Sequence, residues 1–314
     1  MDQRADLGQG SVKRLLFSLS VPTITSQIVN MLYNMVDRVF IGHMQPAETV
    51  GKLALTGVGV CLPVIMVISA FASLMAIGGA PRASIAEGAG ERKKSERIMG
   101  NCLTMLLVTA LVLTVLFEAF AEPLLLLFGA SENTIGYALD YMRIYALGTV
   151  FVQLTLGMNA YITAQGFATV SMKTVLIGAL LNTALDPLFI FALGLGVRGA
   201  ALATVLSQAV SALWVMTFLT GKKTRWRLRK GNLRVRAQIV LPCIALGLSP
   251  FVMQSTESLI AICFNSSLLR YGGDMAVGAM TVLTSIMQFS NMPLQGLTQG
   301  AQPIVSYNYG AKNA

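Results

Sequence analysis

The feature that most constrains the fold is a long internal repeat. The pattern Gly-x-x-Pro-x-x-Ser-x-x-x-Gly-Ala occupies residues 78–89 and returns at residues 300–311, a shift of 222 positions. Pro22 corresponds to Pro250 at a shift of 228, and a shorter loop at Tyr271–Asp274 accounts for the difference of six. A unit of roughly 225 residues therefore begins again near residue 240, and about a third of the second copy follows. Repeats this long are typical of membrane transporters built from two pseudo-symmetric halves.

Composition and apolar stretches place the chain in a membrane. Hydrophobic residues make up 54% of the chain and charged residues 12%, with a mean hydropathy of +0.67. A helix needs about 20 apolar residues to cross a bilayer, and such stretches recur along the sequence. We expect eight transmembrane helices, at residues 15–41, 53–79, 98–120, 137–164, 171–194, 199–220, 239–269 and 275–301. The first is too long and too polar for a signal peptide, so the predicted fold class is an all-α polytopic membrane protein.

Lysine and arginine are distributed unevenly between the two sides of this predicted bundle. With the amino terminus inside, 18 of the 23 basic residues lie on the inner side and 5 on the outer side. Because cytoplasmic loops carry such an excess, we expect a cytoplasmic amino terminus. The basic segment between the sixth and seventh helices is then better explained by anionic lipid headgroups than by a nucleic acid.

The helix count also predicts the division of the chain. Six helices separate the two repeat starts, so both copies enter the membrane from the same side and are related by an axis along the membrane normal. We expect a six-helix N-lobe at residues 1–220, a basic cytoplasmic linker at 221–238 and the first two helices of a C-lobe at 239–314.

Three acidic residues lie well inside predicted membrane spans, namely Asp37, Asp186 and Glu257. A charge at the bilayer centre costs about 2.5–3.5 kcal/mol on insertion scales, so each needs a partner or a functional role. The simpler explanation is an acid satisfied by a nearby arginine or amide. Arg38 adjoins Asp37, but adjacent side chains on a helix point about 100° apart.

Several polar side chains share one level in the outer half of the bundle. Asp37 and Asp186 lie near the outer ends of outward-running helices, and Thr204 and Tyr141 near the outer starts of inward-running helices. Asn182 lies on the same helix face as Asp186, one turn earlier. These five residues predict a shared ion site.

Pro187 directly follows Asp186, removes a backbone donor and favours a kink. The kink could be static, or it could be a hinge beside a titratable group, which is what an ion-coupled switch requires.

Two predicted helices carry long polar stripes at helical spacing. The stripe on the first helix comprises Thr23, Gln27, Asn30, Asn34 and Asp37. The stripe on the eighth comprises Gln288, Asn291, Gln295, Gln299 and Gln302. In lipid such faces must turn toward protein or a wet cavity. Hydrogen bonding between helices is one explanation, but equivalent places in the two halves favour a cavity between them. The predicted substrate-cavity residues are Gln27, Asn30, Asn34, Glu257, Gln288, Asn291 and Gln295.

Four motifs carry a resemblance to a known family. They are Val36–Gly42 (VDRVFIG) in the first helix, Asn182-x-x-x-Asp186-Pro187-Leu188-Phe189-Ile190 in the fifth, Gly196–Thr204 (GVRGAALAT) in the sixth and Gln299-Gly300-x-Gln302-Pro303 in the eighth. The chain resembles a multidrug and toxic compound extrusion (MATE) transporter over essentially its whole length.

The resemblance implies twelve helices in two six-helix lobes and efflux of organic cations driven by H⁺ or Na⁺. It implies that Asp37, Asn182, Asp186 and Thr204 form the N-lobe cation site, which could hold Na⁺, with Tyr141 a looser match. Glu257 corresponds to an acid found in only some members.

The expected function is therefore a proton- or sodium-coupled antiporter that exports small organic cations by alternating access. A bend near Pro22 or a shift at Pro187 would release the drug outward. We expect no cofactor beyond the coupling ion and no nucleic-acid partner. The expected location is a cell membrane, such as a bacterial inner membrane, and the four further C-lobe helices of the family are expected to be needed for transport.

Two other function classes fit the sequence less well. A lipid-linked oligosaccharide flippase shares this architecture but needs a strongly cationic cavity for pyrophosphate, and the spans hold few Lys or Arg. A membrane-embedded enzyme needs a nucleophile with a base, or a metal site. His43 is the only histidine, and the four cysteines, Cys61, Cys102, Cys243 and Cys263, show no ligand or disulfide spacing.

Overall fold

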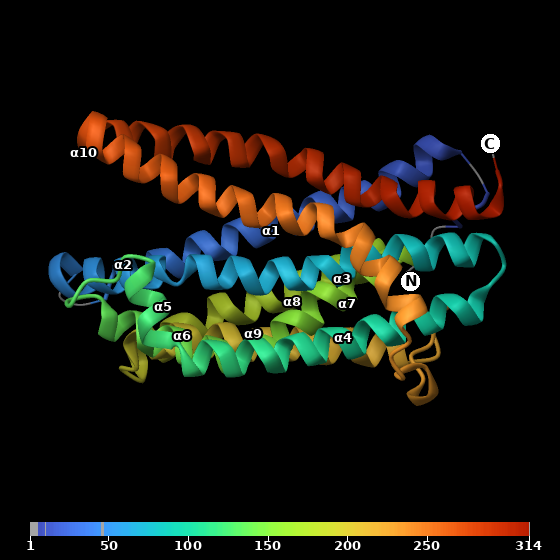
Figure 1. The fold of residues 1–314 in the computed structure, drawn as a ribbon, viewed down its shortest axis with the longest axis horizontal. Helices are drawn as coiled ribbons and strands as arrows, with labels where there is room; N and C mark the ends of the chain where they lie inside the picture. Colours follow the sequence, from blue (N-terminus) through green and yellow to red (C-terminus); the bar gives the residue numbers. More distant parts are fainter. Residues whose placement is uncertain (1–5, 10, 45–46, 314) are drawn as a thin grey trace.

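The protein is a bundle of helices running along one long axis (Figure 1). The computed structural model describes residues 6–9, 11–44 and 47–313, without the side chains of residues 47–48 and of most residues from 257 to 289. Within this part of the chain no strand occurs. The helices are α1 (Val12–Gly42), η1 (Ala47–Gly51), α2 (Lys52–Val60), α3 (Leu62–Gly88), α4 (Arg92–Ala119), α5 (Ala121–Leu127), α6 (Ile135–Leu147), α7 (Thr149–Ala164), α8 (Ala168–Pro187), η2 (Leu188–Ala192), α9 (Gly196–Thr220), η3 (Lys230–Asn232) and α10 (Ala237–Ala311).

The predicted all-α membrane fold is confirmed. Six helical segments among the described residues are long and apolar enough to cross a bilayer. Large apolar side chains also point outward from the bundle: Leu111 on α4, Leu180 on α8 and Leu213 on α9 are 66%, 69% and 67% exposed. Such faces would be costly in water but suit contact with lipid tails.

Three of the predicted spans differ from the observed helices. The span expected at 53–79 is two helices, α2 and α3, which are separated at Cys61, and α3 continues to Gly88. The span expected at 137–164 is two helices, α6 and α7, which meet at Gly148. A Cβ on Gly148 would overlap the Val205 side chain of α9, so the glycine permits close packing where the helix breaks. The span expected at 171–194 ends as α8 at Pro187, and a π-helical turn, η2, completes it.

The predicted interruption of the helix between 269 and 275 is not seen, because α10 is helical from Ala237 to Ala311. The chain nevertheless reverses direction within α10. Gly247 packs against Leu74 of α3 and Gly310 against Ile85. These α3 residues are roughly 17 Å apart along a helix, whereas 63 residues of straight helix would span about 95 Å. Figure 1 accordingly shows α10 as two arms. The second arm also runs ten residues past the expected end at 301, to Ala311, where Lys312 adopts a left-handed conformation.

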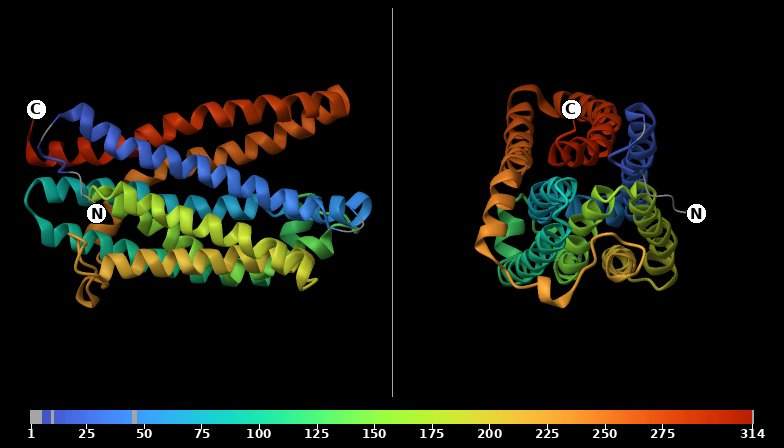
Figure 2. Two further views of the ribbon diagram at one scale, coloured as in Figure 1. Left: turned by 180° about the vertical axis from the view of Figure 1, so that it is seen from behind. Right: turned by 90° about the vertical axis from the view of Figure 1, so that its right-hand side faces the viewer.

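The loops fall into two groups at opposite ends of the bundle (Figures 1 and 2). One end holds the α3–α4 turn, the segment between α9 and α10, the start of α1 and the carboxyl terminus. The other end holds α2, α5 and the reversal of α10. The first end is called the linker end below, because it contains the segment between α9 and α10.

Glycines allow the repeat segments to pack backbone to backbone. A Cβ on Gly88 would overlap the Tyr307 carbonyl, and a Cβ on Gly310 would overlap the Ile85 carbonyl. Under the repeat shift of 222, Gly88 corresponds to Gly310 and Ile85 to Tyr307, so these two contacts are reciprocal. The arms of the repeat therefore meet at the linker end around a local pseudo-twofold axis.

Candidate functional site

Four helices bring polar side chains together away from the linker end. Asp37 comes from α1, Asp186 and Asn182 from α8, and Tyr141 from α6. Their exposed fractions are 9%, 0%, 2% and 4% in that order. Thr204 of α9 is half-buried beside them. These are the five residues from which the sequence predicts an ion site, and Asp186 and Asn182 are among the most buried polar groups of the described chain.

Hydrogen bonds connect three of these side chains. The Asn182 amide nitrogen donates to Asp186 Oδ1 at 3.2 Å and lies 3.4 Å from Thr204 Oγ1. Asp37 lies close enough to interact electrostatically with both Asp186 and the Tyr141 hydroxyl. The side chain of Arg38 is exposed and makes no ion pair with Asp37 among the described residues. The simpler explanation, an acid satisfied by a nearby arginine or amide, holds in part: the charge of Arg38 acts on Asp37 without an ion pair, and Asp186 accepts one hydrogen bond from the Asn182 amide.

Three oxygens at this site are buried without a hydrogen-bond partner among the described residues. They are Asp37 Oδ1, Asn182 Oδ1 and Asp186 Oδ2. An unsatisfied buried acceptor costs about 1–3 kcal/mol, more when it is charged. Oxygen ligands suit hard cations, and a proton on either carboxylate would also supply the missing donor. The arrangement can thus accept H⁺ or a small cation, although the described residues include no cluster of three His, Cys, Asp or Glu side chains.

A cavity of about 580 Å³ lies beside this site. Asn182 and Thr204 belong to its wall, whereas Asp37, Asp186 and Tyr141 do not. Its wall is built by α1, α3, α7, α8, α9 and α10. Because Asn182 also donates to Asp186, its amide joins the cavity to the carboxylate.

The cavity wall is polar but uncharged. Its described side chains include amides, hydroxyls and apolar groups, and none is Asp, Glu, Lys or Arg. Hydrogen bonds close one side, where the Thr23 hydroxyl donates to the Gly296 carbonyl at 2.6 Å and Gln27 Nε2 donates to Gln299 Oε1 at 3.1 Å. A chamber of this kind suits an amphiphilic organic molecule, which needs apolar contact and a few hydrogen bonds.

A family model described as MatE matches residues 22–188 and 250–314, which is most of the chain. The chain belongs to the MatE family. The family is one of membrane transporters rather than enzymes, and its members need no cofactor.

Curated relatives and solved structures agree with the family assignment. The multidrug export protein MepA of Staphylococcus haemolyticus is 26% identical over 96% of this chain and 65% of its own length. MepA of Staphylococcus aureus is 24% identical over 96% of this chain and 65% of its own length. This MatE chain thus spans about 65% of the length of the curated relatives it matches.

Among solved structures, the MATE multidrug transporter DinF-BH is 38% identical, with a TM-score of 0.89 over 98% of this chain and 68% of that one. A MATE family transporter in an outward-facing conformation is 25% identical, with a TM-score of 0.90 over 99% of this chain and 68% of that one.

The predicted cavity residues of this MatE chain have different outcomes. Gln27, Asn30 and Gln295 line the cavity. Asn34 and Asn291 are exposed and are not part of the wall, and the Asn34 amide donates instead to the Asn30 carbonyl at 2.7 Å. These two positions are corrections to the predicted wall. Each stripe is longer than the cavity, so these two residues lie beyond its wall.

Two further predicted cavity residues, Glu257 and Gln288, have side chains outside the described part of the chain.

The predicted hinge residues differ in their surroundings. Pro22 is buried within an unbroken α1, where its carbonyl accepts a hydrogen bond from the Ser26 hydroxyl at 2.9 Å. Pro187 marks the change from α8 to the π-helical turn η2. The wider turn begins where proline removes a helical donor.

Several wall residues were not predicted. Tyr33 of α1 lines the cavity one turn before Asp37, on the same face. Ser207 and Ser211 of α9 continue from Thr204 at spacings of three and four. This helical spacing was a usable signal, but small hydroxyl side chains also bond to their own helix backbone, as Ser207 does to the Ala203 carbonyl at 2.6 Å.

Replacing either carboxylate should abolish ion binding by the purified chain. We expect Asp37→Asn and Asp186→Asn each to remove Na⁺- or H⁺-dependent heat in titration calorimetry, because each removes a charge while keeping side-chain volume. The double variant should lose little more than either single variant, since one site is being removed. Glu122→Gln on exposed α5 removes the same charge elsewhere and should bind ions normally. Normal binding by either single variant would contradict a shared site.

Proposed function

We propose that this chain is part of a cation-coupled antiporter that exports organic cations and other drugs by alternating access between two pseudo-symmetric lobes. The observation that carries the proposal is the pair of buried carboxylates, Asp37 and Asp186, with unpartnered oxygens beside a cavity of drug size. The multidrug export relatives support a drug substrate.

Coupling follows from the shared position of the two carboxylates. Two negative charges in one buried site repel each other, and a bound proton or Na⁺ relieves that repulsion. In the proposed site Asp37, Asn182, Asp186 and Thr204 hold the ion, and Tyr141 lies next to it. Because Asn182 and Thr204 also face the cavity, ion binding there reorients groups that a drug would contact.

The packing of the repeat supports alternating access. At the linker end the two arms are in close backbone contact at Gly88 and Gly310. Opening of the cavity toward the linker end would require the Gly88 and Gly310 contacts to separate. We propose residues 1–220 as the N-lobe, 221–238 as the linker and 239–314 as part of the C-lobe, with hinges at Pro22 and Pro187. A complete cycle requires both lobes, so transport by these residues alone is not expected.

A lipid-linked oligosaccharide flippase is not favoured. Recognition of a pyrophosphate requires cationic side chains in the cavity, and the described wall contains no Lys or Arg.

The proposed location is a cell membrane, with the linker end and amino terminus in the cytoplasm. The uneven Lys and Arg distribution supports this orientation. Single cysteines placed at Lys223 and at Lys52 should react from opposite sides when intact cells and inverted vesicles are treated with an impermeant maleimide. Labelling of the Lys223 position from outside intact cells would reverse the orientation.

Filling the cavity should weaken drug binding. Ala160 lies in the wall, so Ala160→Phe places a ring in the chamber and should lower the affinity for ethidium at least about tenfold, the equivalent of 1.4 kcal/mol. Leu213→Phe adds an aromatic ring on the 67%-exposed outer face of α9 and should leave the affinity unchanged. Ethidium fluorescence anisotropy with purified protein measures both. Unchanged binding by Ala160→Phe would place the drug elsewhere.

A further inference from the structure

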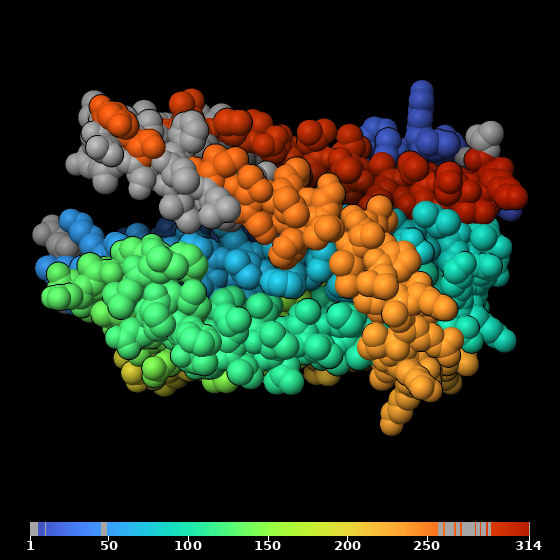
Figure 3. All heavy atoms as spheres, in the orientation of Figure 1, coloured from blue at the N-terminus to red at the C-terminus, as the bar shows by residue number. Residues whose placement is uncertain are grey.

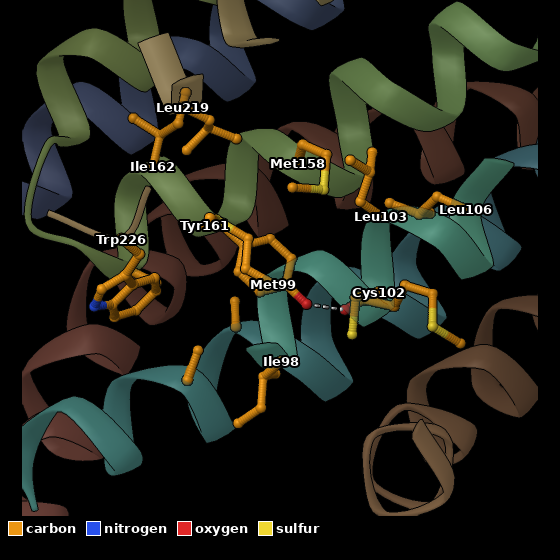
Figure 4. Packing of buried hydrophobic residues seen from close by; sticks show 14 of the residues in the cluster. Ile98, Met99, Cys102, Leu103, Leu106, Met158, Tyr161, Ile162, Leu219 and Trp226 are labelled. Carbon is orange, nitrogen blue, oxygen red and sulfur yellow. Dashed lines mark hydrogen bonds between the residues drawn. The ribbon is translucent and has the colours of Figure 1, made fainter. Parts of the chain in front are cut away.

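The segment between α9 and α10 packs against the helix bundle. Residues 221–236 contain eight Lys and Arg residues and no acidic residue. Its anchor is Trp226, which is 1% exposed and belongs to the same apolar cluster as Ile98, Ile162 and Leu219 (Figure 4). An aromatic side chain buried in this way fixes the surrounding backbone.

Hydrogen bonds from one buried glutamine hold the first half of the segment. Gln165 Oε1 accepts from the Thr224 hydroxyl and from the backbone N–H groups of Arg225 and Trp226, each at 2.8 Å. Gln165 is 2% exposed, so these bonds are shielded from water.

The second half is held by α4. Asn101 Oδ1 accepts from the Arg236 N–H at 2.7 Å, and the Thr104 hydroxyl donates to the Leu233 carbonyl at 2.7 Å. The backbone of the segment is thus held near both ends.

Two buried acids neutralise part of its charge. Glu87 pairs with Arg225 and accepts from Trp226 Nε1 at 3.0 Å. Glu96 lies 3.8 Å from Arg229 and accepts from the Arg227 N–H at 3.1 Å. Six exposed basic residues of the segment have no acidic partner among the described side chains: Lys222, Lys223, Arg227, Lys230, Arg234 and Arg236.

We propose that the exposed face of residues 221–236 is a binding surface for anionic phospholipid headgroups. The segment connects the ends of two membrane helices, Thr220 of α9 and Ala237 of α10, so its cations lie at the level where a bilayer ends. Figures 1 and 3 show it on the lower side of the bundle, near the linker end. Headgroup charges act on cations within about one Debye length, roughly 8–10 Å. A nucleic acid would have to approach against the membrane surface.

The test compares two double variants that remove the same charge at opposite ends. Wild type, Lys222→Gln/Lys223→Gln and Lys52→Gln/Arg143→Gln are reconstituted in nanodiscs of phosphatidylcholine and phosphatidylglycerol. Spin-labelled lipids then report the preference for phosphatidylglycerol. We expect this preference to fall at least about fivefold in the linker variant, the factor for one cation near the surface. It should persist in the Lys52→Gln/Arg143→Gln variant.

An unchanged preference in the linker variant, or an equal fall in both, overturns the proposal. Displacement of the labelled lipid by millimolar inorganic phosphate would identify a free-phosphate site instead. Tight binding of a labelled RNA that depends on Lys222 and Lys223 would identify a nucleic-acid surface. Equal unfolding midpoints of wild type and variants in pure phosphatidylcholine discs show that the variants fold. If the Lys222→Gln/Lys223→Gln variant does not fold, Lys230→Gln/Arg234→Gln takes its place.

Discussion

The structure depends on how a helix bundle surrounded by lipid satisfies its polar groups. Lipid offers no hydrogen bonds, so each buried donor and acceptor needs a partner within the protein or in a wet cavity. Most buried hydroxyls here bond to helix carbonyls; Ser84, for example, donates to Ala164 at 3.1 Å. The Asp37, Asn182 and Asp186 oxygens are among the buried side-chain atoms without a hydrogen-bond partner in the described chain, and these three belong to one site. Because unpartnered buried acceptors are costly, their concentration beside one cavity is the clearest indication of function in the fold.

Close helix packing explains how the cavity is bounded. Gly296 and Gly300 on the second arm of α10 face α1, where an added Cβ would lie 2.6 Å from the Cα atoms of Ile24 and Ser20. Overpacking at such a contact costs about 1–3 kcal/mol. These glycines therefore allow α1 and the second arm of α10 to pack closely along the edge of the cavity. The hydrogen-bonded amides of Gln27 and Gln299 lie beside this contact.

Sequence reasoning predicted the helical membrane class because apolar runs and a 222-residue repeat are properties of the chain itself. It also selected Asp37, Asn182 and Asp186, since charged and amide groups are rare inside membrane spans, and it added Thr204 and Tyr141 because they lie at the same level in the outer half of the bundle. Breaks such as Gly148 were not foreseen, because they depend on a neighbouring helix, here Val205 of α9. Asn34 and Asn291 were assigned to the cavity from spacing alone, which gives a helix face but not where the facing helix ends. The docking of Trp226 was likewise unforeseen, since a basic run gives no sign that Glu87 and Gln165 lie beneath it.

The central claim is that the carboxylate site and the cavity are coupled through Asn182 and Thr204. Binding linkage tests it most directly: ethidium affinity for the purified chain is measured across a range of Na⁺ concentrations and pH, in wild type and Asp186→Asn. Coupling predicts that the affinity of the wild type changes by about 5- to 150-fold as the ion site fills. In Asp186→Asn it should be independent of both ions. An affinity in the wild type that stays constant across both titrations would contradict the account.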